Sequence, residues 1–192
     1  IHLAITSPPY NLGAEYDEYV DEQEINQYRA NLKKVWKEAL RVLVPAGKFA
    51  LNIAPTGISP FRPIHQALCD DVQGAGFTFR AEILWYKQNM GRNTAWGSYM
   101  SPSSPHVVPS WEYVYVFHKG PPKIKFEGKK EDIDITPEEF AKFADAFWII
   151  PPETRDVGGH PAVFPEELVR RLMKFYTYKG NIVLDMFGGV GT

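Results

Sequence analysis

The chain alternates short apolar runs with longer segments whose apolar residues recur every three or four positions. Strand-like runs cover residues 1–5, 48–53, 77–87 and 111–120, and a last one begins at residue 181. Helical periodicity covers 21–44, 63–75 and 165–178, and Thr136-Pro137 predicts a shorter helix. This alternation favours an α/β fold with a parallel-type sheet and helices on both faces.

Composition narrows the class of protein. The 192 residues suit one domain. The formal net charge of −2 does not by itself indicate a nucleic-acid partner, although a chain with this net charge can still carry a local stripe of basic residues. Cys69 is the only cysteine, which excludes an internal disulfide and a cysteine-based metal site. Its setting in a helical segment predicts a core residue. No apolar run approaches the roughly 18 residues that cross a bilayer.

The first strand-like run ends in Ser7-Pro8-Pro9-Tyr10, followed by Asn11. Two adjacent prolines fix two φ angles and supply no backbone donors, so the loop is stiff. One interpretation is a rigid turn with a surface tyrosine. The other is a preorganised site that presents a hydroxyl, free carbonyls and an aromatic ring at a strand end.

The last strand-like run closes on Asp185 and enters a turn with Gly188, Gly189 and Gly191. Glycines there permit a tight turn and a close approach of a ligand to the backbone. The spacing matches neither the dinucleotide fingerprint nor the phosphate loop, so neither a dinucleotide nor an NTP site is indicated.

Two further stretches differ from the rest. Residues 88–110 form a long polar loop, and loops of that length in compact domains are usually functional or disordered. Lys87, Arg92 and Trp96 lie in or beside it and suit phosphate contact by a clamp. Residues 121–147 are charged and predict an inserted lobe, either a target-recognition region or a solvated surface insertion.

Four blocks together resemble the amino-group DNA methyltransferases that use S-adenosylmethionine. The blocks are "TSPPYN" (6–11), "LRVLVPAGKFALNI" (40–53), "HPAVFPEELVRRL" (160–172) and "DMFGGVGT" (185–192). The catalytic loop precedes the cofactor loop, which is the circularly permuted order of the family's beta class. The resemblance implies a Rossmann-like methyltransferase sheet. The ends of the chain look cut, so we expect a core truncated at both ends.

The resemblance implies three parts: 1–120 as the catalytic half, 121–147 as the inserted lobe and 148–192 as an incomplete cofactor-binding half. It assigns catalysis to Ser7, Pro8, Pro9 and Tyr10. Apart from the resemblance, we expect DNA contact from Asn11, Lys87, Arg92 and Trp96. The resemblance assigns S-adenosylmethionine binding, without a metal, to Asp185, Phe187, Gly188, Gly189, Gly191, Thr192, His160, Pro161 and Phe164. Because the acidic residue for the ribose is expected about 20 residues after the glycines, we expect residues 1–192 alone to bind the cofactor weakly or not at all.

The chemistry fits the loop. A conjugated exocyclic amine is a poor nucleophile, and the Ser7 hydroxyl with the Pro8 carbonyl could hold its hydrogens while it is positioned in line with the methyl group. The base must be flipped out, and Tyr10 offers a stacking face. Serine at the first position is typical of cytosine-N4 enzymes, whereas adenine-N6 enzymes mostly carry aspartate, so we favour cytosine N4.

Other functions stay open. They are adenine-N6 methylation of DNA, methylation of an amino group in protein or RNA, and an inactive DNA-binding remnant. The protein and RNA enzymes place the cofactor loop first, the reverse of the order here. The resemblance implies double-stranded DNA as partner, a homodimer, a cognate restriction endonuclease, no membrane, and a cytoplasmic, nucleoid-associated location.

Overall fold

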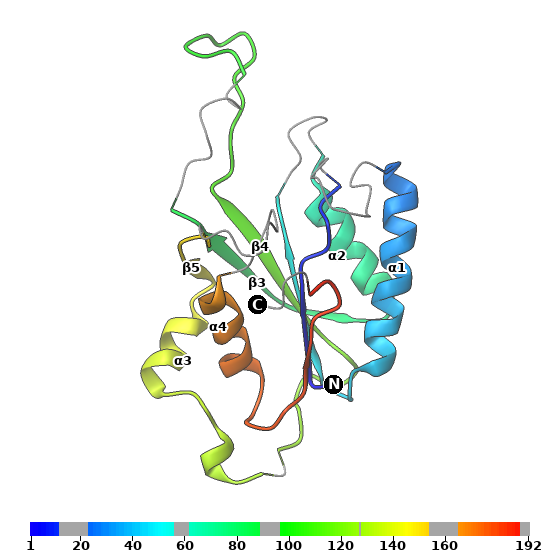
Figure 1. The fold of residues 1–192 in the computed structure, drawn as a ribbon, viewed down its shortest axis with the longest axis vertical. Coiled ribbons are helices and arrows are strands. Elements are labelled where there is room, and N and C mark those ends of the chain that lie inside the picture. The colour runs from blue at the N-terminus through cyan, green and yellow to red at the C-terminus, as the bar shows by residue number, and fades with distance from the viewer. Residues whose placement is uncertain (12–22, 56–61, 89–96, 127, 154–164, 189–192) are drawn as a thin grey trace.

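A computed structural model describes the chain except for residues 12–22, 56–61, 89–96, 127, 154–164 and 189–192 (Figure 1). Within the described residues the strands are β1 (Leu3–Thr6), β2 (Lys48–Ile53), β3 (Thr78–Tyr86), β4 (Trp111–His118), β5 (Phe147–Ile149) and β6 (Val183–Leu184). The helices are α1 (Ile25–Val42), α2 (Ile64–Gly74), α3 (Pro137–Ala144) and α4 (Glu166–Tyr176), with a 3-10 turn at Lys130–Asp132.

The strands form one sheet in the order β5-β3-β4-β2-β1-β6. β1 is parallel to β2 and to β6, and β3 is parallel to β5. β4 is antiparallel to both of its neighbours, so the sheet is mixed and not wholly of the parallel type that the alternation indicated. No helix lies among the described residues between β3 and β4, and the pairing of the two strands from Thr78↔His118 to Tyr86↔Trp111 is antiparallel along their length.

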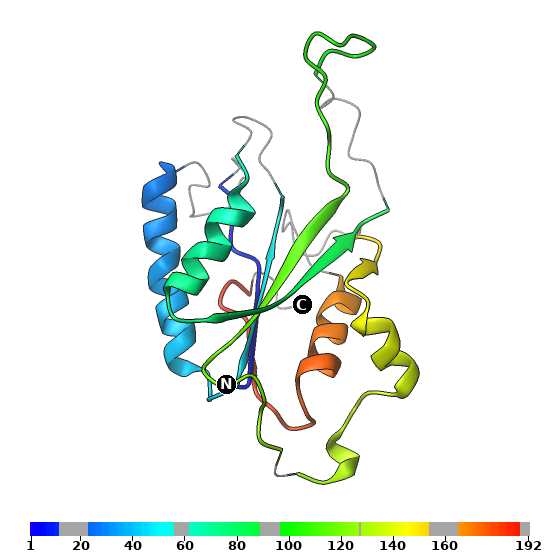
Figure 2. The same ribbon diagram turned by 180° about the vertical axis from the view of Figure 1, so that it is seen from behind.

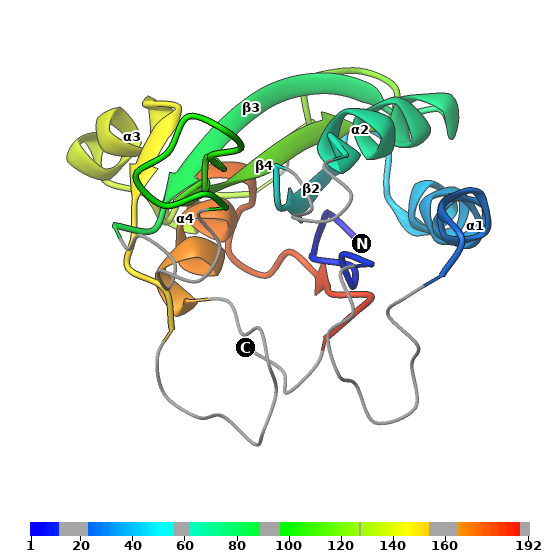
Figure 3. The ribbon, with the colours of Figure 1, turned by 90° about the horizontal axis from the view of Figure 1, so that it is seen from above.

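Helices cover both faces of the sheet, as predicted (Figure 3). Successive strand residues point to opposite faces. Ala4, Phe49 and Phe117 therefore pack with α1 and α2, whereas Leu3 and Ala50 pack with α3 and α4. Both clusters are buried, which gives the sheet two apolar layers and fixes its register.

The predicted helices lie within four residues of their expected ends, and local chemistry explains where they start. The Glu24 carboxylate accepts hydrogen bonds from the first free backbone amides of α1. α3 begins with Pro137 at its first position and a reciprocal capping box between Thr136 and Glu139, as the sequence indicated. β5 was not predicted, because three residues are too short for a strand pattern.

Residues 121–147 contribute to the core as well as to the surface. Phe143 of α3 is buried against the β-sheet face that α4 covers, in the same cluster as Trp148, which directly follows this stretch. A role of this stretch in target recognition stays a prediction. The described part of the long polar loop, residues 97–110, extends well beyond the ends of β3 and β4 (Figure 2). Its exposed apolar side chains include Met100 and Val107.

Candidate active site

Five polar residues lie at the end of the sheet where β1, β2 and β6 finish. Ser7 directly follows β1, Asn52 is next to the last residue of β2, and Asp185 directly follows β6. Because β4 runs the other way, its beginning lies at the same end, and it brings Glu112 there. Lys87 directly follows β3, whose end pairs with the beginning of β4.

The Ser-Pro-Pro-Tyr segment and Asn11 after it are held by one contact from helix α1 and one from the residues just before that helix. The Tyr28 hydroxyl donates to the Pro9 carbonyl at 2.7 Å, and the Tyr28 side chain is fully buried. Asn11 adopts a left-handed backbone (φ 57°), which asparagine tolerates better than most residues. Its side-chain amide bonds the backbone of Gln23 in both directions, at 2.9 and 2.6 Å. These contacts fix both the loop and the entry into α1.

Ser7 belongs to a hydrogen-bonded network that ends on Glu112. The Ser7 hydroxyl donates to Tyr10 Oη at 2.8 Å, and Tyr10 Oη donates to Glu112 Oε2 at 2.9 Å. Asn52 Nδ2 donates to Tyr10 Oη at 2.7 Å and to Glu112 Oε2 at 2.5 Å. Lys87 Nζ donates to Glu112 Oε1 at 2.5 Å. The network spans the Ser-Pro-Pro-Tyr loop, β2, β4 and the residue that directly follows β3.

Burial makes this network energetically significant. Glu112 is 9% exposed and Asn52 3% exposed. A buried carboxylate is costly unless it is paired, and Lys87 supplies the partner. Desolvation, and then the Glu112 carboxylate, raise the pKa of the Tyr10 hydroxyl well above its usual value, so the phenol is protonated at neutral pH. Asn52 Oδ1 is a buried acceptor without a hydrogen-bond partner among the described residues.

A second contact joins the strand of the catalytic loop to the predicted cofactor turn. Thr6, fully buried and adjacent to Ser7, donates through Oγ1 to Asp185 Oδ1 at 3.0 Å. The same oxygen accepts from the backbone amide of Phe187 at 2.9 Å, which shapes the turn. A Cβ added at Gly188 would meet nothing within 4 Å, so the described part of this turn borders open space.

Both loops rest on the same side of the sheet. The rings of Tyr10 and Phe187 and the side chain of Met186 pack against the core cluster that α1 and α2 cover. Residues from opposite ends of the chain are therefore neighbours around one layer of the core. The pairing of β1 with β6 makes this possible.

The structure thus brings together a subset of the predicted site residues. Ser7, Tyr10 and Lys87 share one network, and Asp185 is one hydrogen bond from Thr6, next to Ser7. Asn11, predicted to contact DNA, bonds the backbone of Gln23. Eight further predicted residues lie outside the described part of the chain: His160, Pro161, Phe164, Gly189, Gly191, Thr192, Arg92 and Trp96.

Sequence reasoning missed Thr6, Asn52 and Glu112. Asn52 is the polar residue of the otherwise apolar "FALNI", and Glu112 is a charge within the aromatic "WEYVYVF". Polar residues at such buried positions are a usable signal, because buried polar groups are almost always hydrogen-bonded. Their partners, however, come from strands that only the sheet order brings together.

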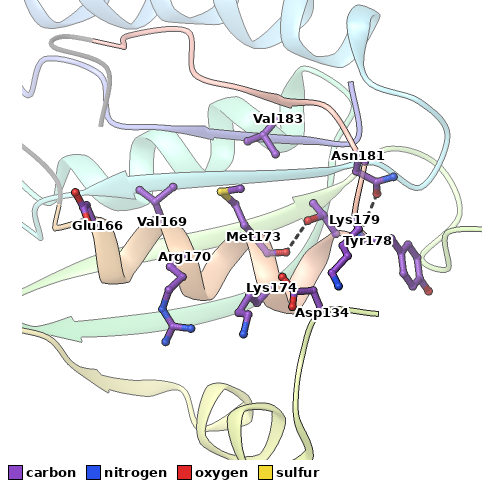
Figure 4. A pocket seen from close by; sticks show the side chains of 12 residues that line it. Asp134, Glu166, Val169, Arg170, Met173, Lys174, Tyr178, Lys179, Asn181 and Val183 are labelled. Atoms are coloured by element: carbon purple, nitrogen blue, oxygen red, sulfur yellow. Dashed lines mark hydrogen bonds between the residues drawn. The ribbon is translucent and has the colours of Figure 1, made fainter. Parts of the chain in front are cut away.

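Hollows also occur away from this end of the sheet. One of about 590 Å³ lies along α4 and β6, where Val169, Met173 and Val183 supply apolar surface and Arg170 and Lys174 supply charge (Figure 4). None of its lining residues belongs to the network around Ser7. Over the described ranges, no cluster of three or more His, Cys, Asp or Glu suits a metal ion. No helix in that part of the chain is long and apolar enough to cross a membrane.

Comparison with known proteins identifies relatives of the chain. A family model described as DNA methylase, of the N6/N4 type, matches residues 1–192. The type II methyltransferase M.MjaVI of Methanocaldococcus jannaschii is 34% identical over 81% of this chain and 79% of its own length. M.MjaI of the same organism is 30% identical over 100% of this chain and 75% of its own length.

Solved structures agree with the sheet and its helices. TTHA0409 of Thermus thermophilus, complexed with S-adenosyl-L-methionine, superimposes with a TM-score of 0.70 at 25% identity and covers 100% of this chain and 74% of its own. The cytosine-N4-specific PvuII DNA methyltransferase shares the fold, with a TM-score of 0.70 at 21% identity over 100% of this chain and 68% of its own. On its sequence match over the full 192 residues, the chain belongs to the N6/N4 family of DNA methylases.

Proposed function

We propose that this protein transfers the methyl group of S-adenosylmethionine to the exocyclic amine of a DNA base, with cytosine N4 as the favoured acceptor. The observation that carries the proposal is the hydrogen bond between Thr6 and Asp185. It joins the strand that leads into the Ser-Pro-Pro-Tyr loop to the turn that resembles the family's cofactor loop. A methyl donor and an acceptor amine held by these two loops would be neighbours.

Ser7 and Pro8 act on the acceptor side. The lone pair of a base amine is delocalised into the ring, so the nitrogen must be oriented for attack. The reaction needs no covalent nucleophile from the enzyme. The Ser7 hydroxyl and the Pro8 carbonyl accept the two amine hydrogens and turn the nitrogen towards the methyl group. Most of the remaining rate effect comes from in-line positioning by a rigid loop, which the bonds from Tyr28 and Asn11 support.

The residues present fit the cofactor. Bound there, S-adenosylmethionine supplies an electrophilic methyl group on a sulfonium. Asp185, Phe187 and Gly188 would hold it, since the turn borders open space and Asp185 is oriented by Thr6. By resemblance, Gly189, Gly191, Thr192, His160, Pro161 and Phe164 complete its contacts. The complex of TTHA0409 with S-adenosyl-L-methionine supports this choice of donor.

DNA is the substrate that the family and the type II methyltransferases among its relatives support. The target amine is inaccessible within a duplex, so the base flips out, and the Tyr10 ring offers it a stacking face beside Ser7. Serine at the first position of the loop supports cytosine N4. Adenine N6 is the second candidate, because the family model covers both reactions.

Protein partners and location rest on the resemblance. We expect double-stranded DNA as the macromolecular partner and action at the nucleoid. A homodimer and a cognate restriction endonuclease stay predictions. Asn11, Lys87, Arg92 and Trp96 remain our candidates for DNA contact. Residues 97–110 contain no lysine or arginine. A contact of such a side chain from the long polar loop to DNA would therefore come from Lys87 or Arg92.

The full-length protein, incubated with radiolabelled S-adenosylmethionine and duplex DNA, tests the proposal. We expect label in DNA, and none in RNA or bulk protein offered at equal mass. Ser7→Ala is the matched inactive control. Label in RNA or protein, but not in DNA, would reject the assignment. A folded protein that labels none of the three would favour a DNA-binding remnant.

A further inference from the structure

Glu112 is the buried carboxylate at which the network around Ser7 ends. It is 9% exposed and accepts three donors: Lys87 on Oε1, and Tyr10 and Asn52 on Oε2. Lys87 Nζ forms an ion pair with Oε1 at 2.5 Å, and the carboxylate of such a pair can only accept hydrogen bonds. Lys87 and the Asn52 amide nitrogen, in turn, can only donate.

These fixed roles dictate the direction of every other bond in the network. Tyr10 has a single hydroxyl proton, and the carboxylate beside it requires that proton. Tyr10 Oη can therefore only accept from Ser7, at 2.8 Å, and from Asn52, at 2.7 Å. The single proton of Ser7 is committed to Tyr10 in the same way. The free lone pairs of Ser7 Oγ then face outward from the network.

The direction matters for the reaction, because the target amine is a hydrogen-bond donor. If the Ser7 hydroxyl accepted a hydrogen bond from Tyr10, its own proton would point towards the amine hydrogens and repel them. A serine that donates into the loop presents an acceptor. We propose that Glu112 is a positioning residue which, through Tyr10, holds the Ser7 hydroxyl as an acceptor for the target amine.

This inference rests on the proposed function, and it adds roles for Glu112, Asn52 and Lys87 that the Ser-Pro-Pro-Tyr motif does not contain. Glu112 touches neither substrate nor cofactor in this account. A purely structural ion pair between Glu112 and Lys87 is the competing explanation. It predicts a loss of stability, but no dependence on the hydroxyl of Tyr10.

Glu112→Gln in the full-length protein separates the two explanations. The carbonyl oxygen of the new glutamine accepts from Lys87, so its amide group donates towards Tyr10. The Tyr10 hydroxyl then donates to Ser7 Oγ, and Ser7 no longer presents a free acceptor to the amine. We expect kcat on duplex DNA to fall about 100-fold, with DNA affinity and KM for S-adenosylmethionine within about threefold. Glu112→Asp keeps an acceptor and should recover at least about tenfold of that loss. Glu38→Gln, an exposed carboxylate of α1, should leave kcat unchanged.

Tyr10→Phe supplies the decisive arm, since it keeps the ring for stacking and removes only the hydroxyl. We expect it to lower kcat about tenfold by releasing the Ser7 proton. In the Tyr10→Phe background, Glu112→Gln should change kcat less than about threefold, because the link to Ser7 is already broken. The same 100-fold loss in both backgrounds would overturn the proposal.

The outcomes also distinguish this inference from the proposed function. If wild type methylates DNA, Ser7→Ala does not, and Glu112→Gln is as active as wild type, the function stands and the role of Glu112 is wrong. If wild type does not methylate DNA, both fail. Should Glu112→Gln not fold, as judged by circular dichroism, an unchanged kcat in Tyr10→Phe would by itself contradict the proposal, and a tenfold loss would support it.

Discussion

Two loops follow neighbouring parallel strands at one end of the sheet, and they differ in how they are held. The loop after β1 continues a fully buried strand that is flanked on both sides, and hydrogen bonds hold its Ser7, Pro9, Tyr10 and Asn11. The turn after β6 follows a half-buried strand of two residues, and its described anchor is Asp185.

The difference shows which of the two loops is held rigidly. The loop that would orient the amine needs atomic precision, because a reacting nitrogen must lie in line with the methyl group. The turn that would receive the cofactor needs open space beside its backbone, which Gly188 leaves. We infer that the catalytic loop is preorganised, whereas the turn depends on the contact between Thr6 and Asp185.

The largest expected effect comes from breaking the rigid loop at its reactive group. Ser7→Ala should lower kcat by about 100- to 1,000-fold, as loss of a preorganised hydrogen-bonding group does in other enzymes. Its cost in stability should stay near 1 kcal/mol, because Ser7 supplies one hydrogen bond. Single-turnover kinetics and DNA binding on the full-length protein measure both. Unchanged turnover would reject the role of Ser7.

The next largest effect comes from cutting the contact between the two loops. Thr6→Val removes the donor to Asp185 and should weaken S-adenosylmethionine binding about tenfold, the equivalent of one hydrogen bond to a charged group. Turnover at saturating cofactor should change much less. Calorimetry of the full-length protein provides the measurement, and Thr177→Val, on a hydroxyl that bonds Met173 outside the site, is the matched control. Equal affinities in Thr6→Val and wild type would count against the coupling.

A smaller effect is expected at the anchor of the catalytic loop. Tyr28→Phe leaves the Pro9 carbonyl without its donor and should cost about 1 kcal/mol of unfolding free energy, with a loss of about threefold in kcat. Tyr86→Phe, on a half-buried tyrosine at the end of β3, should cost less than about 0.5 kcal/mol. Chemical denaturation compares the two. If Tyr28→Phe lost no more unfolding free energy than Tyr86→Phe, the hydrogen bond from Tyr28 to Pro9 would contribute little to stability.

The smallest effect is a pH dependence that comes from Tyr10. Burial, and then Glu112, raise the pKa of its hydroxyl above the value of about 10 that it has in an unfolded chain. Between the two pKa values the unfolded state has lost the proton and the folded state still holds it, so stability falls as pH rises above about 10. Relative to Tyr10→Phe, wild type should therefore lose stability in alkali. Parallel alkaline denaturation curves for the two proteins would contradict the raised pKa.

The sequence was sufficient for much of the fold, because the elements that it predicts depend on local chemistry. Apolar spacing defined α1 and α2, and Thr136-Pro137 defined the start of α3. The order of the strands could not be predicted from the sequence. Only the structure shows that β4 lies antiparallel between β2 and β3. The motifs identified Ser7 and Asp185. Asn52 and Glu112 were missed, because their shared partner Tyr10 lies in the loop after β1, 42 and 102 positions away along the chain.

Mass spectrometry of nucleosides from DNA tests the central claim most directly. Cells that express the full-length protein would be compared with cells that express its Ser7→Ala variant. We predict N4-methylcytosine in the first DNA and its absence from the second. N6-methyladenine instead would keep the fold and the site but reverse the choice of base. No methylated base in either DNA, with the protein folded and expressed, would contradict the claim that this site modifies DNA.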